Sequence, residues 1–115
     1  PERIEAGVTA LDLTAVGTLS FERPDFGRFP ALALAYRVLA AGGTAPAILN
    51  AANEVAVAAF LAGTLGFDRI PEIVEAVLDR HERKDVSGLD VVLEADARAR
   101  EFAESLLVGA ARSRA

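Results

Sequence analysis

The sequence predicts a mainly α-helical fold: a four-helix bundle-like carboxy-terminal domain preceded by an extended linker with one short β-strand. Two observations support this prediction. From residue 30 onward, apolar side chains recur at helical spacing in four segments, which glycine, proline or short polar stretches separate. Residues 1–29 have no such period and are dotted with glycine and proline. We therefore divide the chain into a linker and strand segment, 1–29, and a helical bundle domain, 30–115.

The strand is expected at residues 18–22, where apolar and polar residues alternate briefly. Leu19 and Phe21 would face the same side, because side chains alternate along a strand with period two. A single strand is not stable by itself. We therefore expect it to pair with a sheet that this sequence does not contain.

The first helix is expected from Pro30 to Ala41. Pro30 fits the first helical turn, where its missing N–H would have had no partner, and Gly42-Gly43 supply the stop. The predicted core-facing stripe consists of Leu32, Tyr36 and Leu39, widened by Ala35 and Val38.

The second helix is expected to be buried, because beyond Glu54 it is apolar on every face as far as Ala62. Thr44 is a candidate amino-terminal cap, and the helix is expected to restart at Asn50 after a short turn, with Asn50 as its cap. Asn53 and Glu54 lie at the same helix mouth and are assigned capping roles too. Phe60 is expected to lie in the core.

The third helix is expected to start at Asp68, with Pro71 in its first turn. Its apolar stripe comprises Ile70, Ile73, Val74, Val77 and Leu78. A fourth helical region begins at Leu89, and Asp96 is predicted to cap a longer continuation. Arg100 lies four residues after Asp96, the spacing at which opposite charges on a helix pair.

Composition excludes several classes of function. The formal net charge is −5 over 115 residues, so a nucleic-acid partner, which requires clustered lysine and arginine, is not expected. The absence of cysteine excludes disulfides, thiolate zinc sites and a cysteine nucleophile, and it fits a cytoplasmic location. The longest apolar stretch, residues 55–65, is too short to cross a membrane.

No residue pattern indicates catalysis, cofactor binding or metal binding in this chain. His81 is the only histidine, and no Ser nucleophile or orienting carboxylate is paired with it in the sequence, so a structural role is expected. Glu72, Glu75 and Asp79 share one helix face and could ligate a hard cation, but a solvated face is the simpler interpretation. Gly42-Gly43-Thr44 lacks the Gly-Lys-Ser/Thr ending of a phosphate-binding loop.

Several strings, in order and with their spacing, give the sequence a specific resemblance. They are Arg3-Ile4, Leu11-Asp12-Leu13, Pro24-Asp25, Arg28-Phe29-Pro30, Leu49-Asn50-Ala51-Ala52-Asn53-Glu54-Val55 and Asp96-Ala97-Arg98-Ala99-Arg100-Glu101. Together they resemble the carboxy-terminal portion of 1-deoxy-D-xylulose 5-phosphate reductoisomerases, from residue 1 to about residue 107. The resemblance implies the end of a catalytic domain, a linker and a helical bundle.

The resemblance also implies what the remainder of such an enzyme does. The parent would use NADPH and a divalent cation (Mg, Mn or Co) to rearrange and reduce 1-deoxy-D-xylulose 5-phosphate to 2-C-methyl-D-erythritol 4-phosphate, in the non-mevalonate isoprenoid pathway. It would be a homodimer. The family's catalytic, metal and NADPH residues match no position here, so the bundle's expected partner is the remainder of the enzyme and the fragment alone is expected to be inactive.

Two other interpretations remain open from the residues alone. The first is a stand-alone helical module that dimerises or binds a partner, which would predict the same helices. The second is a helical pocket for an apolar ligand, which would need a sizeable cavity. The many alanines between residues 51 and 59 indicate close helix packing instead.

Overall fold

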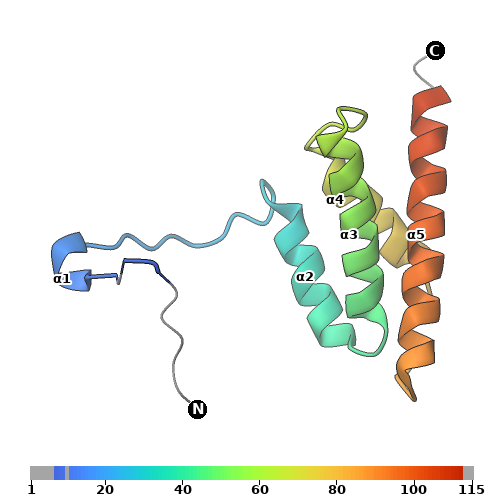
Figure 1. Ribbon diagram of the computed structural model, residues 1–115, viewed down its shortest axis with the longest axis horizontal. Coiled ribbons are helices and arrows are strands. Elements are labelled where there is room, and N and C mark those ends of the chain that lie inside the picture. The colour runs from blue at the N-terminus through green and yellow to red at the C-terminus, as the bar shows by residue number, and fades with distance from the viewer. Residues whose placement is uncertain (1–6, 10, 113–115) are drawn as a thin grey trace.

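The computed structural model describes residues 7–9 and 11–112, with side chains as far as Val108. Within these residues it contains helices and no strand. The helices are α1 (Leu13–Val16), α2 (Pro30–Ala41), α3 (Ala45–Leu61), α4 (Arg69–Arg80) and α5 (Leu89–Arg112) (Figure 1). The prediction of a mainly α fold with a four-helix bundle is confirmed, and the expected first helix has the predicted bounds.

The described residues before α2 form an extended arm that leads away from the bundle (Figure 1). Its single helical turn, α1, is capped by Asp12, whose Oδ1 accepts hydrogen bonds from the N–H groups of Thr14 at 2.8 Å and Ala15 at 3.4 Å. The hydroxyl of Thr14 also donates to this carboxylate, and these bonds lower the pKa of Asp12. The arm is ordered locally, and α1 packs on none of the other helices that the structure describes.

The predicted strand at residues 18–22 is extended chain in the structure, with no ladder partner among the described residues. Phe21 is 88% exposed there. The strand stays a prediction, because the sheet expected to complete it lies outside this sequence.

The bundle is organised around α3, which packs against α2, α4 and α5 (Figure 1). Five alanines on α3 and α5 are completely buried and let the two backbones approach closely. They are Ala51, Ala52, Ala56, Ala99 and Ala103. On α4 the predicted stripe is confirmed, with Ile73, Val74 and Val77 in the same core.

The inward face of α2 differs from the prediction. Val38 of the expected stripe is buried as predicted, together with Leu34, whereas Leu32, Tyr36 and Leu39 point outward. The physical reason is that α2 is apolar on opposite sides, so spacing alone cannot say which side meets α3. Packing selects the side of Leu34 and Val38.

The predicted restart at Asn50 is wrong, because α3 runs without a break from Ala45 to Leu61 and places Asn50 in its second turn. The expected cap at Asp96 is wrong for the same reason, since α5 is continuous from Leu89. The side-chain carboxamide of Asn50 and the carboxylate of Asp96 form hydrogen bonds with other side chains instead of capping a helix. A helix already started by Pro46 has good helix formers on either side of Asn50 and needs no new start there.

Thr44 directly precedes α3, as predicted, but its hydroxyl does not cap the helix. It accepts a hydrogen bond from the backbone N–H of Lys84 at 3.0 Å, and the N–H of Thr44 donates to the carbonyl of Lys84 at 2.9 Å. Gly43 beside it has φ +57°, and a Cβ there would collide with the same carbonyl. This staple joins the α2–α3 turn to the α4–α5 loop.

Phe60 was expected in the core but is 37% exposed at the carboxy-terminal end of α3. Its ring meets that of Phe67 edge to face, with centroids 5.6 Å apart. The end of α3 is apolar on every face, and the neighbouring helices do not cover all of it, so some of its apolar side chains lie at the surface.

Candidate functional site

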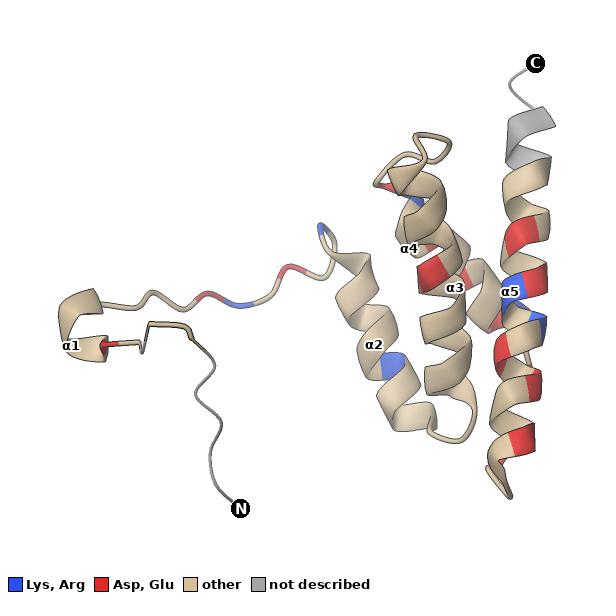
Figure 2. Cartoon of the chain, in the orientation of Figure 1, with Lys and Arg blue, Asp and Glu red and all other residues tan. Residues whose placement is uncertain are grey.

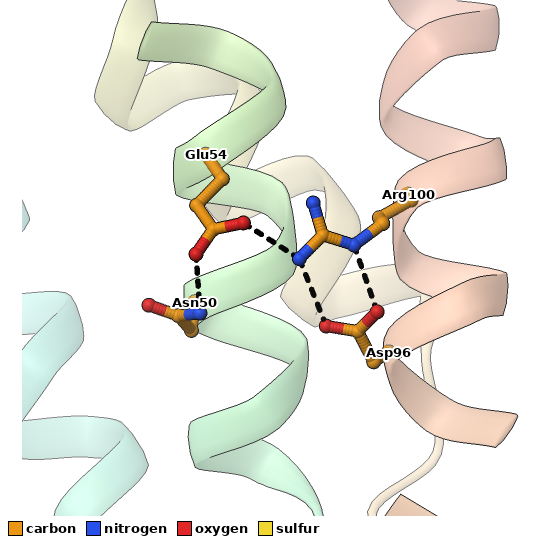
Figure 3. A network of polar contacts seen from close by, with 4 residues as sticks. All are labelled: Asn50, Glu54, Asp96 and Arg100. Carbon is orange, nitrogen blue, oxygen red and sulfur yellow. Dashed lines mark hydrogen bonds and ion pairs between the residues drawn. The ribbon is translucent and has the colours of Figure 1, made fainter. Parts of the chain in front are cut away.

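The most connected polar site lies between α3 and α5 and is centred on Arg100 (Figure 3). Its guanidinium donates two bonds to Asp96, at 2.7 Å from Nε and 3.1 Å from Nη2. The same Nη2 donates to Oε2 of Glu54 at 2.7 Å, and Asn50 donates its amide N–H to Oε1 of Glu54 at 3.0 Å. The four residues form one chain of hydrogen bonds that links the two helices.

Electrostatics within this network favour the charged forms of Glu54 and Arg100. The hydrogen bond from Arg100, followed by that from Asn50, lowers the pKa of Glu54. Asp96 and then Glu54 raise the pKa of Arg100. Each carboxylate accepts two hydrogen bonds from donors of this chain, so the network is suited to holding the two helices in register.

Three of the four residues predicted to cap helices are therefore brought together, in a different role. Asn50, Glu54 and Asp96 bridge helices, whereas Asn53 faces another part of the surface. The spacing of Asp96 and Arg100 predicted their own pair. The bond from Arg100 to Glu54 spans 46 residues, and no local sequence signal could have indicated it.

Asn53 lines a largely apolar cavity of about 510 Å³ at the amino-terminal end of α2. The exposed rings of Phe29 and Phe67 stand at this cavity, and Val57 and Ile70 complete its apolar wall. Arg28 and Asp68 also line it. A cavity of this size with two aromatic rings and a largely apolar wall can receive an apolar side chain.

His81 ends α4 and is half-buried. Its Nδ1 lies 2.9 Å from the carbonyl of Val77, and its ring meets Phe102 edge to face at 6.0 Å. A separate cavity of about 410 Å³ lies beside it, lined by Arg80, Arg98 and Glu94 among others. The packing of the ring and its bond to the helix carbonyl are those of a structural histidine.

Of the three carboxylates on the acidic face of α4, two belong to separate ion pairs and Glu75 is exposed. Glu72 lies 2.6 Å from Nε of Arg69, and Asp79 lies 3.0 Å from Arg37 on α2. Among the described residues no three metal-ligating side chains come together. These carboxylates therefore do not fit a divalent cation as a group.

A family model described as the DXP reductoisomerase C-terminal domain matches residues 1–102. The chain belongs to this family. The 1-deoxy-D-xylulose 5-phosphate reductoisomerase of Aromatoleum aromaticum is 60% identical over 105 residues, which are 91% of this chain and 26% of that protein. The enzyme of the same name from Burkholderia multivorans is 56% identical over 110 residues, 96% of this chain and 28% of its own. The chain thus spans about a quarter of the length of these curated relatives.

Solved structures give the same result for the fold of this DXP reductoisomerase C-terminal domain. The Zymomonas mobilis enzyme in complex with NADPH has 45% sequence identity and a TM-score of 0.80, over 93% of this chain and 28% of that one. A DOX-P reductoisomerase in complex with NADPH, fosmidomycin and magnesium has 38% identity and a TM-score of 0.78, with the same coverage. In both solved structures the matching segment is 28% of the chain.

Two features of the DXP reductoisomerase C-terminal domain escaped sequence reasoning. The staple at Thr44 joins segments 40 residues apart, and the apolar outer side of α2 was expected to face inward. A Gly-Gly-Thr turn was a weak signal for the staple. For α2 the signal was present in Tyr36 and Leu39, which repeat at helical spacing, and only the direction was undetermined. Along the described chain, no helix combines the length and apolar character that a membrane crossing requires.

Proposed function

We propose that this chain is the carboxy-terminal structural domain of a full-length 1-deoxy-D-xylulose 5-phosphate reductoisomerase. The observation that carries the proposal is 60% identity to a reductoisomerase of which the chain spans only 26%. In this proposal residues 1–29 belong to the end of the catalytic domain, and 30–115 are the helical bundle. The whole enzyme is a cytoplasmic homodimer, as the family resemblance implies.

The full-length enzyme isomerises its sugar phosphate substrate and reduces the intermediate with NADPH and a divalent cation. Support for these cofactors comes from solved relatives described with NADPH and with magnesium. We assign the cation and the nucleotide to the remainder of the polypeptide, because Glu72 and Asp79 here are already engaged by arginines. When bound, the cation would polarise oxygens of the substrate.

The contribution of this domain is rigidity. The close packing of α3 and α5 and the network around Arg100 fix the bundle as one body, and a rigid body that packs against a catalytic domain can hold its loops in place. Small displacements of positioning groups reduce rates strongly. The domain therefore acts on the reaction through geometry and contributes no reacting group.

The test is an assay of NADPH oxidation with 1-deoxy-D-xylulose 5-phosphate and Mg²⁺. The full-length gene product is expected to be active, and the 115-residue chain alone is expected to give no more than the blank. Tight NADPH binding or turnover by the 115-residue chain would overturn the proposal. So would a gene whose reading frame begins directly before Pro1, which favours a stand-alone dimerisation module instead.

A further inference from the structure

One surface of the bundle is unlike the others. The outer face of α2, which we define as Leu32, Tyr36 and Leu39 together with Phe29 just before the helix, is apolar and open to solvent. Tyr36 is 57% exposed and Leu39 76% exposed. Arg37 is the only charged residue of α2, and Figure 2 shows the rest of the helix in tan, whereas the described part of α5 carries red and blue residues at intervals.

The opposite side of α2 already meets the bundle through Leu34 and Val38. The helix is therefore apolar on two opposing sides, which is the pattern of a helix that is covered on both. The exposed apolar residues follow i, i+4 and i+7, so they form a continuous stripe rather than scattered positions. Stripes of this kind mark interaction surfaces.

The arm indicates which part of the protein covers this stripe. Phe26, near the end of the arm, already packs on Tyr36 edge to face, with ring centroids 6.1 Å apart. The arm leaves the bundle on the α2 side (Figure 1). In the relatives about three quarters of the chain lies outside the matched segment, and in the proposed full-length enzyme that polypeptide would be connected to the bundle through this arm, on the side of α2.

The aromatic-lined cavity extends the same surface. It shares Phe29 with the outer face of α2 and has about 510 Å³ of space between α2, α3 and α4. An apolar stripe that ends in a cavity is the arrangement in which a single protruding side chain anchors a docked partner.

We propose that the outer face of α2 is the docking surface for the domain that precedes this chain in the same polypeptide. The matching surface is apolar where it covers α2, offers an acceptor for the Tyr36 hydroxyl, and places one large apolar side chain in the cavity beside Phe29, whose lining also includes Arg28 and Asp68. The inference rests on the proposed function, since it requires the chain to be part of a longer enzyme.

The experiment places a photo-crosslinker on the face in the full-length enzyme. Tyr36→p-benzoylphenylalanine is compared with Leu93→p-benzoylphenylalanine, a matched control on the charged side of α5, where the native leucine is 59% exposed. After irradiation, the Tyr36 probe is expected to give a crosslink within one chain, mapped by peptide mass spectrometry to residues upstream of Pro1. The control is expected to leave the chain uncrosslinked.

Two outcomes would overturn the docking surface. If the Tyr36 probe gave a covalent dimer of two full-length chains, the face would be assigned to a second copy. If its crosslink yield equalled that of the Leu93 control, the face would be exposed to solvent. A second variant tests the same surface without a probe: Leu39→Glu should raise the rate of proteolysis within the arm several-fold in the full-length enzyme, and Leu93→Glu should not. Equal rates for both variants contradict the proposal.

The same preparations separate this inference from the proposed function. Reductoisomerase activity of the unsubstituted full-length protein tests the function, and the crosslink map tests the docking. An upstream crosslink in an inactive protein would preserve the docking surface and remove the function. An active protein without that crosslink would do the reverse.

Discussion

The helices α2 and α5 flank the central helix α3, and they differ in what they present to the outside (Figures 1 and 2). On α5 the buried contacts are two alanines, and the outward side carries charges that pair along the helix, such as Glu94 with Arg98 at 2.7 Å. On α2 the buried contacts are Leu34 and Val38, and the outward side is apolar.

This difference shows that the outward residues of a helix, more than its inward ones, indicate whether another protein surface covers it. Charges in i, i+4 pairs are stabilising in water and costly to bury under another protein surface. The outward side of α5 is therefore suited to contact with solvent. An apolar stripe has the opposite preference. The predictions that follow test whether the two helices really differ in this way.

The largest expected effect contrasts the two sides of α2. Leu34→Ala should lower the free energy of unfolding of the 115-residue chain by about 2–5 kcal/mol, because it empties a buried position. Leu39→Ala on the other side should change it by less than about 0.5 kcal/mol in this chain, since the side chain is in water. Urea titration measures both. In the full-length enzyme Leu39→Ala should become clearly destabilising, and an unchanged value there would remove the distinction between α2 and α5.

A smaller effect is expected where α5 meets α3. Ala103→Leu should destabilise by about 1–3 kcal/mol, because the site is fully buried and has no room for added methylenes. Ala97→Leu, on the exposed side of the same helix, is the matched control and should be nearly neutral. Thermal unfolding followed by circular dichroism gives both values. Equal losses would mean that helix propensity, and not close packing, controls this interface.

The end of α3 gives a third, still smaller effect. Phe60→Ala should cost about 0.5–1.5 kcal/mol from the lost ring pair with Phe67, which is below the loss of a buried aromatic, since Phe60 is 37% exposed. A double-mutant cycle with Phe67→Ala isolates the ring contact. A coupling energy near zero would show that the two rings do not interact in solution.

The smallest effect is a dependence on pH. The folded-state pKa of Glu54 lies below its ordinary value of 4.5, so the stability that its ionised form contributes is fully present above that value and is lost as pH falls through the folded pKa. In urea titrations below about pH 4.5, Glu54→Gln should flatten the decline of stability with falling pH. Glu104→Gln, on the exposed side of α5, is the control. Identical profiles for Glu54→Gln and the wild type would exclude Glu54 as a titrating contributor.

The sequence predicted helices well where one face only is apolar. The stripe of α4 gave both the helix and its inward side, because Glu72 and Glu75 mark the opposite face. On α2 the helix bounds were predicted but the inward side was not, since no charge besides Arg37 distinguishes the two sides. Asn50 and Asp96 were placed at helix starts because they favour such positions locally, and tertiary partners far along the chain decided otherwise.

The candidate site was predicted only in part, for a similar reason. Glu54 and Asp96 were predicted to cap helices, whereas the structure joins them through the guanidinium of Arg100, which bonds to both across two helices. Sequence spacing gives contacts within one helix. A contact between helices depends on how they pack, which periodicity does not specify.

The staple at Thr44 and Lys84 affects how the bundle can loosen. It joins the α2–α3 hairpin to the α4–α5 hairpin at one end only, through two backbone-anchored hydrogen bonds. At the opposite end the chain itself joins the same two hairpins, because residues 62–68 connect α3 to α4. The hairpins are thus tied at both ends, and partial opening of the bundle, which follows the weakest contacts, should not begin by separating them at either end.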